Sequence, residues 1–273
     1  MKVNVFRKDI RDYYLEHKRA FPWRATGSLS SKTRAYRVLV SEIMLQQTQA
    51  ERVIPKYQMF VKRFPTIMSL ANAEFQEVLA QWQGLGYNRR ARMLHNAARQ
   101  IMKEHQGEIP KDEKTLTHLP GIGPYTAGAI RAFAYNLPAI IIETNIRSVF
   151  IHFFFSRTAQ VKDSDIIPLI EKTLDRKNVA EWYSALMDYG SMLKKKEKNP
   201  SRRSSHYKKQ SPFKNSNREV RGVIVRTLVE KKYSISALTQ RLKLYGKKRV
   251  LEQLHALSRE EIVTVKRGFA SVA

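Results

Sequence analysis

The sequence predicts a mainly α-helical protein with a small α+β part at its C-terminal end. Apolar residues recur three to four positions apart through most of the first 195 residues, as a helix with one buried face requires. Examples are the runs Val53–Val61, Phe75–Trp82 and Leu94–Met102. Alternating apolar and polar residues, the pattern of a half-buried strand, are rare before residue 260.

Prolines and glycines divide this helical region into segments. They lie between the periodic runs, and both proline and glycine tend to interrupt a helix. The residues are Pro65, Gly84, Gly86, Pro110 and Pro120. We therefore expect residues 1–195 to form two helical lobes with a cleft between them.

The composition changes after Leu193. The stretch KKKEKNPSRRSSHYKKQSPFKNSNR is polar, basic and almost free of apolar residues, so we expect residues 196–217 to form an extended linker or loop. It is either a disordered spacer or an arm that lies along phosphates. The density of basic residues favours the arm, because each contact of Lys or Arg with a phosphate adds affinity.

The last segment, residues 218–273, has a different pattern. REVRGVIVRTLVEKK, SISALTQRLK and KKRVLEQLHALSREE each predict an amphipathic helix, the second capped by Ser234 or Ser236. IVTVKRGFASVA predicts a short strand pair. Three helices followed by a β wing is the winged-helix order, which is typical of DNA binding. A small helical bundle used only for packing is the alternative.

The charge points to a polyanionic partner. The chain of 273 residues has 50 basic and 24 acidic residues and a formal net charge of +26. Such a surface attracts nucleic acid, the leading partner, ahead of an anionic membrane surface. No signal peptide or apolar stretch of spanning length is present in the sequence, so we expect a cytoplasmic protein without a membrane partner, associated with the nucleoid if prokaryotic.

A glycine turn lies in the middle of the chain. Gly121 and Gly123 stand between a helix predicted to end near His118 and one predicted to begin near Tyr125. Glycines permit a tight turn, and the free N–H groups of the following helix can then bind a phosphate. Such turns also occur as plain helix connectors, but the basic composition favours DNA binding.

Four motifs in order resemble those of the helix-hairpin-helix DNA glycosylases, and specifically the MutY-like adenine DNA glycosylases. They are SEIMLQQTQAERVIPKY, WQGLGYNRRAR, LPGIGPYTAGAI and ETNIRSVF, and the resemblance covers about residues 8–192. It implies a two-lobed helix-hairpin-helix glycosylase fold over residues 1–195. The six-helix lobe would cover about residues 28–136, and the second lobe about residues 1–27 and 137–195.

Breaking an N-glycosidic bond calls for two carboxyl groups in different states, because the leaving base is protonated and the sugar passes through a cation. Glu42 lies among apolar residues, which would raise its pKa, and the matching glutamate of the family protonates adenine. A solvent-exposed helix acid is the alternative. Glu143 ends an apolar run where relatives carry aspartate, which stabilises the sugar cation or its adduct; a helix cap is the alternative.

Two further residues take catalytic roles from the resemblance. Tyr125 stands where relatives with lyase activity have lysine, so the resemblance implies a monofunctional enzyme; the matching tyrosine supports the sugar. A packing aromatic is the alternative. The residue matching Asn145 holds the carboxylate or a water molecule.

An enzyme that acts on a base must evert it and fill the gap. Gln46, Gln47 and Tyr87 match the wedge and intercalating positions of the family. Arg24, beside Trp23, matches a residue near the base pocket and would contact the base, a phosphate or a salt-bridge partner. Arginines are expected along the phosphate track: Arg89, Arg90 and Arg92.

The chain departs from the resemblance in two places. Most relatives hold an iron–sulfur cluster with four cysteines after the motif matching MDYGSM, whereas this chain has no cysteine, so we expect no such cluster. Residues 218–273 are also too few for the usual 8-oxoguanine-recognition domain.

We therefore expect a monomeric DNA glycosylase of base excision repair that acts on double-stranded DNA with a mispaired or damaged base. Adenine opposite G or 8-oxoguanine is the leading substrate. The alternatives are excision of thymine, uracil or a modified base by the same scaffold, and a non-catalytic DNA-binding protein.

Overall fold

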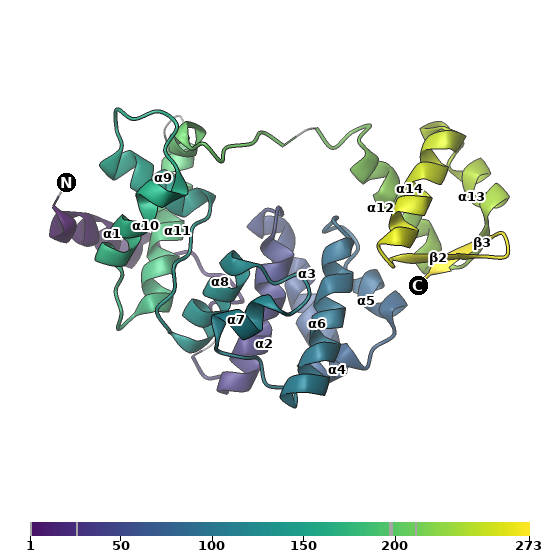
Figure 1. Ribbon diagram of the computed structural model, residues 1–273, viewed down its shortest axis with the longest axis horizontal. Helices are drawn as coiled ribbons and strands as arrows, with labels where there is room; N and C mark the ends of the chain where they lie inside the picture. Colours follow the sequence, from purple (N-terminus) through teal and green to yellow (C-terminus); the bar gives the residue numbers. More distant parts are fainter. Residues whose placement is uncertain (1, 26, 197–198, 211) are drawn as a thin grey trace. The chain divides into compact units, whose positions relative to one another are not determined.

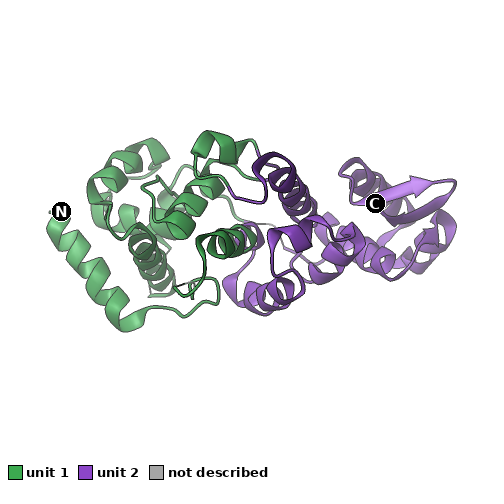
Figure 2. Ribbon diagram, turned by 90° about the horizontal axis from the view of Figure 1, so that it is seen from below, with its two compact units in different colours: residues 1–42, 110–118, 122–209 green, residues 43–109, 119–121, 210–273 purple. Residues whose placement is uncertain are grey.

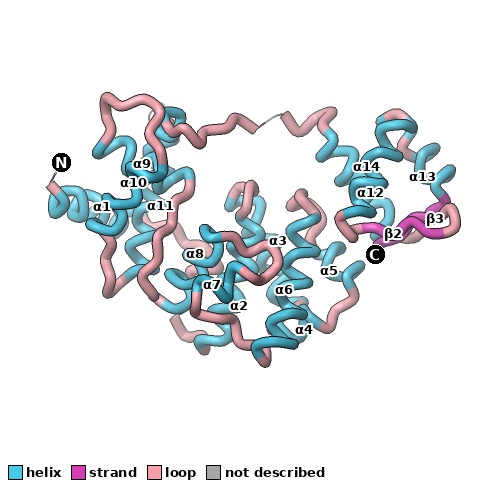
Figure 3. Tube along the Cα trace, viewed as in Figure 1, coloured by secondary structure: helices cyan, strands magenta, loops and turns pink. Residues whose placement is uncertain are grey.

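The computed structural model describes residues 2–25, 27–196, 199–210 and 212–273, and helices dominate them (Figure 1). Strands occur only near the C-terminal end of the described chain (Figure 3). The mainly helical fold with a small C-terminal sheet is therefore as predicted. No described helix is both long and apolar enough to cross a membrane.

The chain folds as two compact units (Figure 2). Unit 1 comprises residues 1–42, 110–118 and 122–209, and unit 2 comprises residues 43–109, 119–121 and 210–273. Helix α2 (Ser31–Leu45) begins in unit 1 and ends in unit 2. The lobe boundaries expected from the sequence stay a prediction.

Unit 1 is helical. Besides most of α2 it contains α1 (Val3–His17), α7 (Glu113–Thr117), α8 (Pro124–Tyr135), α9 (Thr144–Phe154), α10 (Asp163–Thr173) and α11 (Val179–Lys196). Helix α11 packs against α1, α8 and α9. The Phe6 ring lies 5.4 Å from Phe150 and 6.0 Å from Trp182, and all three side chains are buried. This aromatic core joins α1, α9 and α11.

Helices α9 and α11 approach most closely at Gly190. A Cβ atom at Gly190 would lie 2.2 Å from the carbonyl oxygen of Asn145 and 2.8 Å from its Cα atom. Only glycine therefore fits here, because the obstructing atoms belong to backbone and cannot rotate away. The contact fixes the first turn of α9, directly after Glu143.

The first part of the predicted linker is packed on unit 1. The 3₁₀ helix η1 (Pro200–Arg203) lies against α9, and Val161 forms an isolated parallel bridge with Ser204. The guanidinium of Arg203 donates to the carbonyls of Phe155, Ser156 and Ile151 at the end of α9. Residues 199–205 are thus a packed turn and not the extended linker predicted, because their polar groups bond to free helix-end carbonyls.

Unit 2 begins with four helices after the end of α2. They are α3 (Ala50–Arg63), α4 (Ile67–Ala71), α5 (Phe75–Gln81) and α6 (Arg89–His105), and α6 packs against both α4 and α5. The large buried side chains of this part include Tyr57, Phe60 and Trp82. They come from the periodic runs that predicted the helices.

The C-terminal part of unit 2 has the predicted winged-helix order. Its elements are α12 (Asn217–Glu230), β1 (Tyr233–Ser234), α13 (Ile235–Arg241), η2 (Lys243–Tyr245), α14 (Lys247–Arg259), β2 (Val263–Lys266) and β3 (Phe269–Val272). The strands form an antiparallel sheet in the order β1-β3-β2, with Val265 opposite Ala270. Ser234 caps α13, as expected. Strand β1 was not predicted, because two residues are too few to show an alternating pattern.

The C-terminal part is attached to α5 and α6. Helix α12 packs against α5, and the Gln76 amide donates to the Val229 carbonyl at 2.9 Å. The Arg92 guanidinium stacks 3.4 Å from the centre of the Phe75 ring and donates to the carbonyl of Glu261. The C-terminal part is therefore joined to α5 and α6 through α12 and through the residue Glu261, which precedes β2.

We expect Gly190→Ala to lower the free energy of unfolding by about 2–3 kcal/mol, because overpacking against fixed backbone forces the helices apart. Urea denaturation of the full chain measures this. Gly222→Ala is the matched control, since nothing lies within 4 Å of its added Cβ on α12 and alanine favours a helix. Equal stability of Gly190→Ala and wild type would contradict the close contact.

Candidate active site

Glu42 lies near the end of α2 and is only 6% exposed, so it is not the solvent-exposed helix acid that the sequence left open. Its neighbours Ile43 and Met44 are buried as well. Burial is the largest cause of a raised pKa, about 7 in place of 4.5. The negative charge of Glu143 acts in the same direction, whereas the Tyr125 hydrogen bond and the charge of Arg24 lower the pKa. Near neutral pH this carboxyl can hold a proton.

Tyr125 is in the first turn of α8, and its side chain is hydrogen-bonded to that of Glu42. Burial raises the pKa of the hydroxyl well above its ordinary value, and the charges of Glu42 and Glu143 raise it further. The hydroxyl therefore stays protonated and can donate to the Glu42 carboxylate. Tyr125 is more than a packing aromatic, because its hydroxyl is hydrogen-bonded to the Glu42 side chain.

Glu143 is the N-cap of α9, and its carboxylate is held by the start of its own helix. Oε1 accepts from the backbone N–H of Asn145 at 2.7 Å and of Ile146 at 2.9 Å. Oε2 accepts from the Asn145 side-chain amide at 3.1 Å. Three N–H donors and the positive end of the helix dipole stabilise a negative charge here. Glu143 therefore caps α9, which was the alternative considered from the sequence, and the same hydrogen bonds orient its carboxyl group.

Arg24 is held by Asp188 of α11. Its Nη1 and Nη2 atoms donate to the two carboxylate oxygens of Asp188 at 2.8 and 2.9 Å, and Arg19 also donates to Asp188 at 2.7 Å. Burial opposes ionisation of Asp188, but its two arginine partners hold the pKa of that carboxyl below its usual value. Of the alternatives for Arg24, the structure therefore shows the ion pair.

These side chains form one cluster within unit 1. Glu42, Tyr125, Glu143 and Arg24 each affect the pKa of another member, and Asn145 orients Glu143. The cluster pairs a carboxyl group that can hold a proton near neutral pH with a carboxyl group that accepts N–H donors at a helix start. Such a pair can protonate a leaving group and stabilise a cation in the same reaction.

Sequence reasoning missed Asp188 and Lys194, both on α11. Asp188 is part of the quoted MDYGSM motif, and its spacing from the buried Ser184 and Ala185 places it on the apolar face of the helix, which was a usable signal. Lys194 is one turn beyond Gly190. Burial lowers the pKa of its ammonium group, while the charge of Glu143 acts against this effect. No sequence pattern distinguished Lys194 from the adjacent lysines.

The residues predicted to contact DNA gather in unit 2, with the exception of Arg24 and Gly123. Gln46 donates to the Gly121 carbonyl at 3.5 Å, Gln47 is exposed, and both Gln47 and Tyr87 have positive φ. Gly121 has φ +77° and touches Met93, where a Cβ would lie 2.7 Å away. Arg89 is exposed at the start of α6. The turns at residues 46–48, 84–87 and 119–121 all belong to unit 2.

Arg90 and Arg92 do not form the exposed phosphate track that the sequence predicts. They are 9% and 8% exposed, and Arg90 donates to the carbonyls of Ile43 and Met44 at 2.8 and 2.7 Å. Arg90 thus closes the free carbonyl end of α2, and Arg92 holds the C-terminal part. The helical period explains the difference, because both positions face the interior of unit 2 while Arg89 does not.

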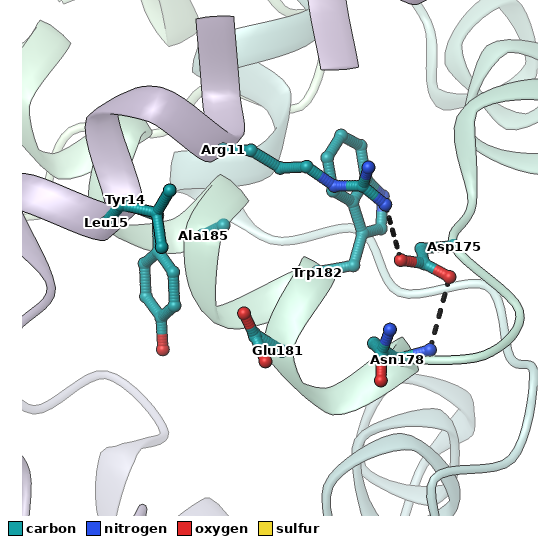
Figure 4. A pocket seen from close by; sticks show the side chains of 8 residues that line it. All are labelled: Arg11, Tyr14, Leu15, Asp175, Asn178, Glu181, Trp182 and Ala185. Carbon is teal, nitrogen blue, oxygen red and sulfur yellow. Dashed lines mark hydrogen bonds and ion pairs between the residues drawn. The ribbon is translucent and has the colours of Figure 1, made fainter. Parts of the chain in front are cut away.

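A separate pocket lies between α1 and α11 (Figure 4). Arg11, Tyr14, Asp175 and Glu181 are among its lining residues, and Arg11 pairs with Asp175 at 2.6 Å. No residue of the cluster lines it. Among the described residues no group of three or more His, Asp or Glu side chains is placed to hold a metal ion.

Residues 40–169 match the family described as HhH-GPD superfamily base excision DNA repair protein. This range includes Glu42, Tyr125, Glu143 and Asn145, but neither Arg24 nor the C-terminal part of unit 2.

Curated relatives share a large part of the helical region. An adenine DNA glycosylase of Mus musculus is 41% identical over 150 residues, which is 54% of this chain and 29% of that protein. An adenine DNA glycosylase of Mycolicibacterium smegmatis is 37% identical over 195 residues, which is 70% of this chain and 64% of that protein. The chain therefore spans less than two thirds of the length of these relatives.

A solved structure of a thermostable thymine-DNA glycosylase has the same fold. It aligns with a TM-score of 0.62 at 24% identity, over 75% of this chain and 96% of that one. The helix-hairpin-helix glycosylase fold expected from the sequence is thereby confirmed.

We expect Glu42→Gln to stabilise the protein increasingly as the pH rises from 5 to 8. The folded-state pKa of Glu42, about 7, lies above the ordinary 4.5, so the folded state binds more protons between these values. The free energy of unfolding therefore falls as the pH rises through this window. Glutamine does not titrate, so its advantage over wild type should grow by about 3 kcal/mol.

Denaturant titrations at several pH values measure this difference. Glu171→Gln, an exposed change on α10, is the control and should show little pH dependence relative to wild type. If the difference in unfolding free energy between Glu42→Gln and wild type does not change with pH, the pKa of Glu42 is not raised in the folded state.

Proposed function

We propose that this chain, which carries an HhH-GPD domain, is a monofunctional DNA glycosylase of base excision repair, with mispaired adenine as its substrate. The observation that carries the proposal is the pairing, in one cluster, of a buried, protonatable Glu42 with Glu143, whose side chain caps the start of α9. The curated relatives named adenine DNA glycosylase make adenine the leading base. The base opposite would be G or 8-oxoguanine.

Glu42 would be the general acid. Its proton is transferred to a ring nitrogen of the everted adenine, and the electron pair of the N-glycosidic bond leaves with the base. A pKa of about 7 suits this step, because the acid is still protonated near neutral pH but releases its proton readily. The Tyr125 hydroxyl can donate to the carboxylate that is left behind.

Glu143 would stabilise the positive charge that develops on the sugar. Its carboxylate is fixed by Asn145 and Ile146 before the substrate binds, so little reorganisation is needed in the transition state. The longer side chain, where relatives carry aspartate, folds back onto the start of its own helix. A water molecule then completes hydrolysis and leaves an abasic site.

Tyr125 supports assignment as a monofunctional enzyme. A lyase needs an amine that forms a Schiff base with the opened sugar, and a tyrosine hydroxyl cannot do so. Arg24, fixed by Asp188, would lie next to the everted base and help to place Glu42.

DNA would be bound by the turns of unit 2, by Gly123 and by the basic surface. We propose that Gln46, Gln47 and Tyr87 fill the gap left by the everted base, and that Gly121, Gly123 and Arg89 contact phosphates. Residues 196–217 and the winged-helix part, residues 218–273, would add contacts to the duplex. We further propose that the protein is a cytoplasmic monomer that works without an iron–sulfur cluster.

A panel of labelled duplexes tests the proposal. The pairs are A:8-oxoguanine, A:G, T:G, U:G and undamaged A:T, followed by hot alkali to break abasic sites. Strand breaks with A:8-oxoguanine or A:G are expected. Breaks with T:G or U:G alone would favour the alternative that the same scaffold excises thymine or uracil, in line with the replacement of the family aspartate by Glu143. Tight binding without breaks in any duplex would favour a non-catalytic protein.

We expect Glu42→Gln to lower the single-turnover excision rate by about 100-fold or more, because the proton donor is lost. Affinity for a non-cleavable A:8-oxoguanine duplex should stay within about twofold, since the fold and the DNA-contacting turns are unchanged. Glu171→Gln is again the control. Full activity of Glu42→Gln would place the acid elsewhere.

The pH dependence gives a second test of the acid. The wild-type single-turnover rate should fall as the pH rises above about 7, approaching tenfold per pH unit, because only protonated Glu42 is active. A rate that rises steadily to pH 9 would contradict a general-acid role for Glu42.

A further inference from the structure

Tyr87 is held by residues that follow it by more than a hundred positions. Its hydroxyl accepts a hydrogen bond from the Gln210 amide at 2.5 Å and one from Nη1 of Arg218 at 2.9 Å. Gln210 precedes the winged-helix part, and Arg218 is in the first turn of α12. All three residues belong to unit 2.

The ring of Tyr87 also lies near two guanidinium groups. Arg90 is 5.4 Å and Arg218 is 5.8 Å from the ring centre, within cation–π range. Arg90 is immobilised by its bonds to the carbonyls of Ile43, Met44 and Gly86. The ring therefore has one support from Arg90 of α6 and a second from Arg218 of α12.

The second support is itself fixed in place. Helix α12 buries Val220 and Ile224 and packs against α5, and its C-terminal turn receives the hydrogen bond from Gln76. Arg218 thus reaches Tyr87 from a helix that packs against α5. Tyr87 stands in the left-handed region, at φ 48°, directly after Gly86, so its backbone also restricts the ring.

We propose that Arg218 is a positioning residue for Tyr87, and that the winged-helix part thereby takes part in recognition of the mispair. The inference rests on the proposed function, in which Tyr87 enters the duplex beside the lesion. A ring held in one orientation before binding loses less side-chain entropy on insertion. Arg218 also places a positive charge beside the ring, where the DNA backbone must pass.

The same contacts allow the opposite effect. If Arg218 and Gln210 held Tyr87 away from the duplex, the insertion of the ring would first have to break two hydrogen bonds. Loss of Arg218 would then tighten lesion binding. The two possibilities predict changes of opposite sign, so one experiment separates them.

The experiment uses the full chain and the variants Arg218→Met, Tyr87→Phe and their combination. Methionine keeps much of the length of the arginine stem but removes charge and donors, and phenylalanine removes only the acceptor hydroxyl. Arg226→Met is the matched control, because Arg226 is exposed on the same helix and its loss changes the charge equally. Thermal melting confirms that each variant is folded.

Two readouts avoid any need for excision. One is the ratio of affinities for a duplex with 2′-fluoro-2′-deoxyadenosine opposite 8-oxoguanine and for an undamaged duplex, at one salt concentration. The other is the fluorescence of 2-aminopurine placed next to the 8-oxoguanine, which rises when an inserted ring disturbs stacking. A purely structural role of Arg218 would change melting but not the fluorescence of the bound complex.

We expect Arg218→Met and Tyr87→Phe each to lower the affinity ratio by roughly tenfold and to reduce the 2-aminopurine signal, as loss of a charge-assisted hydrogen bond would. The double variant should resemble the single variants, because both remove the same contact. Arg226→Met should lower both affinities equally and leave the ratio unchanged.

Three outcomes would overturn the inference. They are a higher affinity ratio in Arg218→Met, additive effects in the double variant, and a response of Arg226→Met equal to that of Arg218→Met. Failure of the proposed function is recognised separately, by wild-type protein that excises no base from any duplex.

Discussion

The removal of the Glu42 carboxyl group from water is the constraint on which the site depends. Glu42 is 6% exposed among apolar neighbours, so ionisation of its carboxyl group costs free energy. The favourable interactions within the cluster do not fully offset this desolvation cost. Tyr125 and Arg24 favour the anion, whereas burial and the charge of Glu143 oppose it, and the result is a pKa near 7. Helix α9 supplies the Glu143 carboxyl group with backbone N–H donors, which favour a negative charge at that position.

The surrounding helices maintain this difference between the two acids. Gly190 brings α11 against the first turn of α9, so the donors that hold Glu143 cannot shift. Asp188, two residues earlier, fixes Arg19 and Arg24 and sets the positive charge that acts on Glu42. At the other end of α9, Arg203 binds the free carbonyls. One helix pair thus determines the position of one acid and part of the electrostatic environment of the other.

In unit 2, two buried arginines stabilise the fold, and within the described residues neither forms an ion pair with a carboxylate. Arg90 and Arg92 bind backbone carbonyls and aromatic rings in the interior, so they stabilise turns and join the winged-helix part to α5 and α6. A count of basic residues therefore overstates the charge available to DNA. Among the arginines that are not buried, Arg218 bonds to the hydroxyl of Tyr87 and lies near its ring.

The sequence by itself determined the helical class, the glycine turn and the order of the C-terminal helices and final strand pair, and it proposed Glu42 and Glu143 as the two acids. These features depend on local periodicity, capping and residue order, which are properties of neighbouring positions. The tertiary structure decided what depends on distant residues: the pairing of Arg24 with Asp188, the inward direction of Arg90 and Arg92, the packed turn at 199–205 and the support of Tyr87 by Arg218. Burial and charge at these positions depend on segments that are distant in the sequence, such as the 46 residues between Arg90 and Met44 and the 164 between Arg24 and Asp188, so a local pattern does not show them.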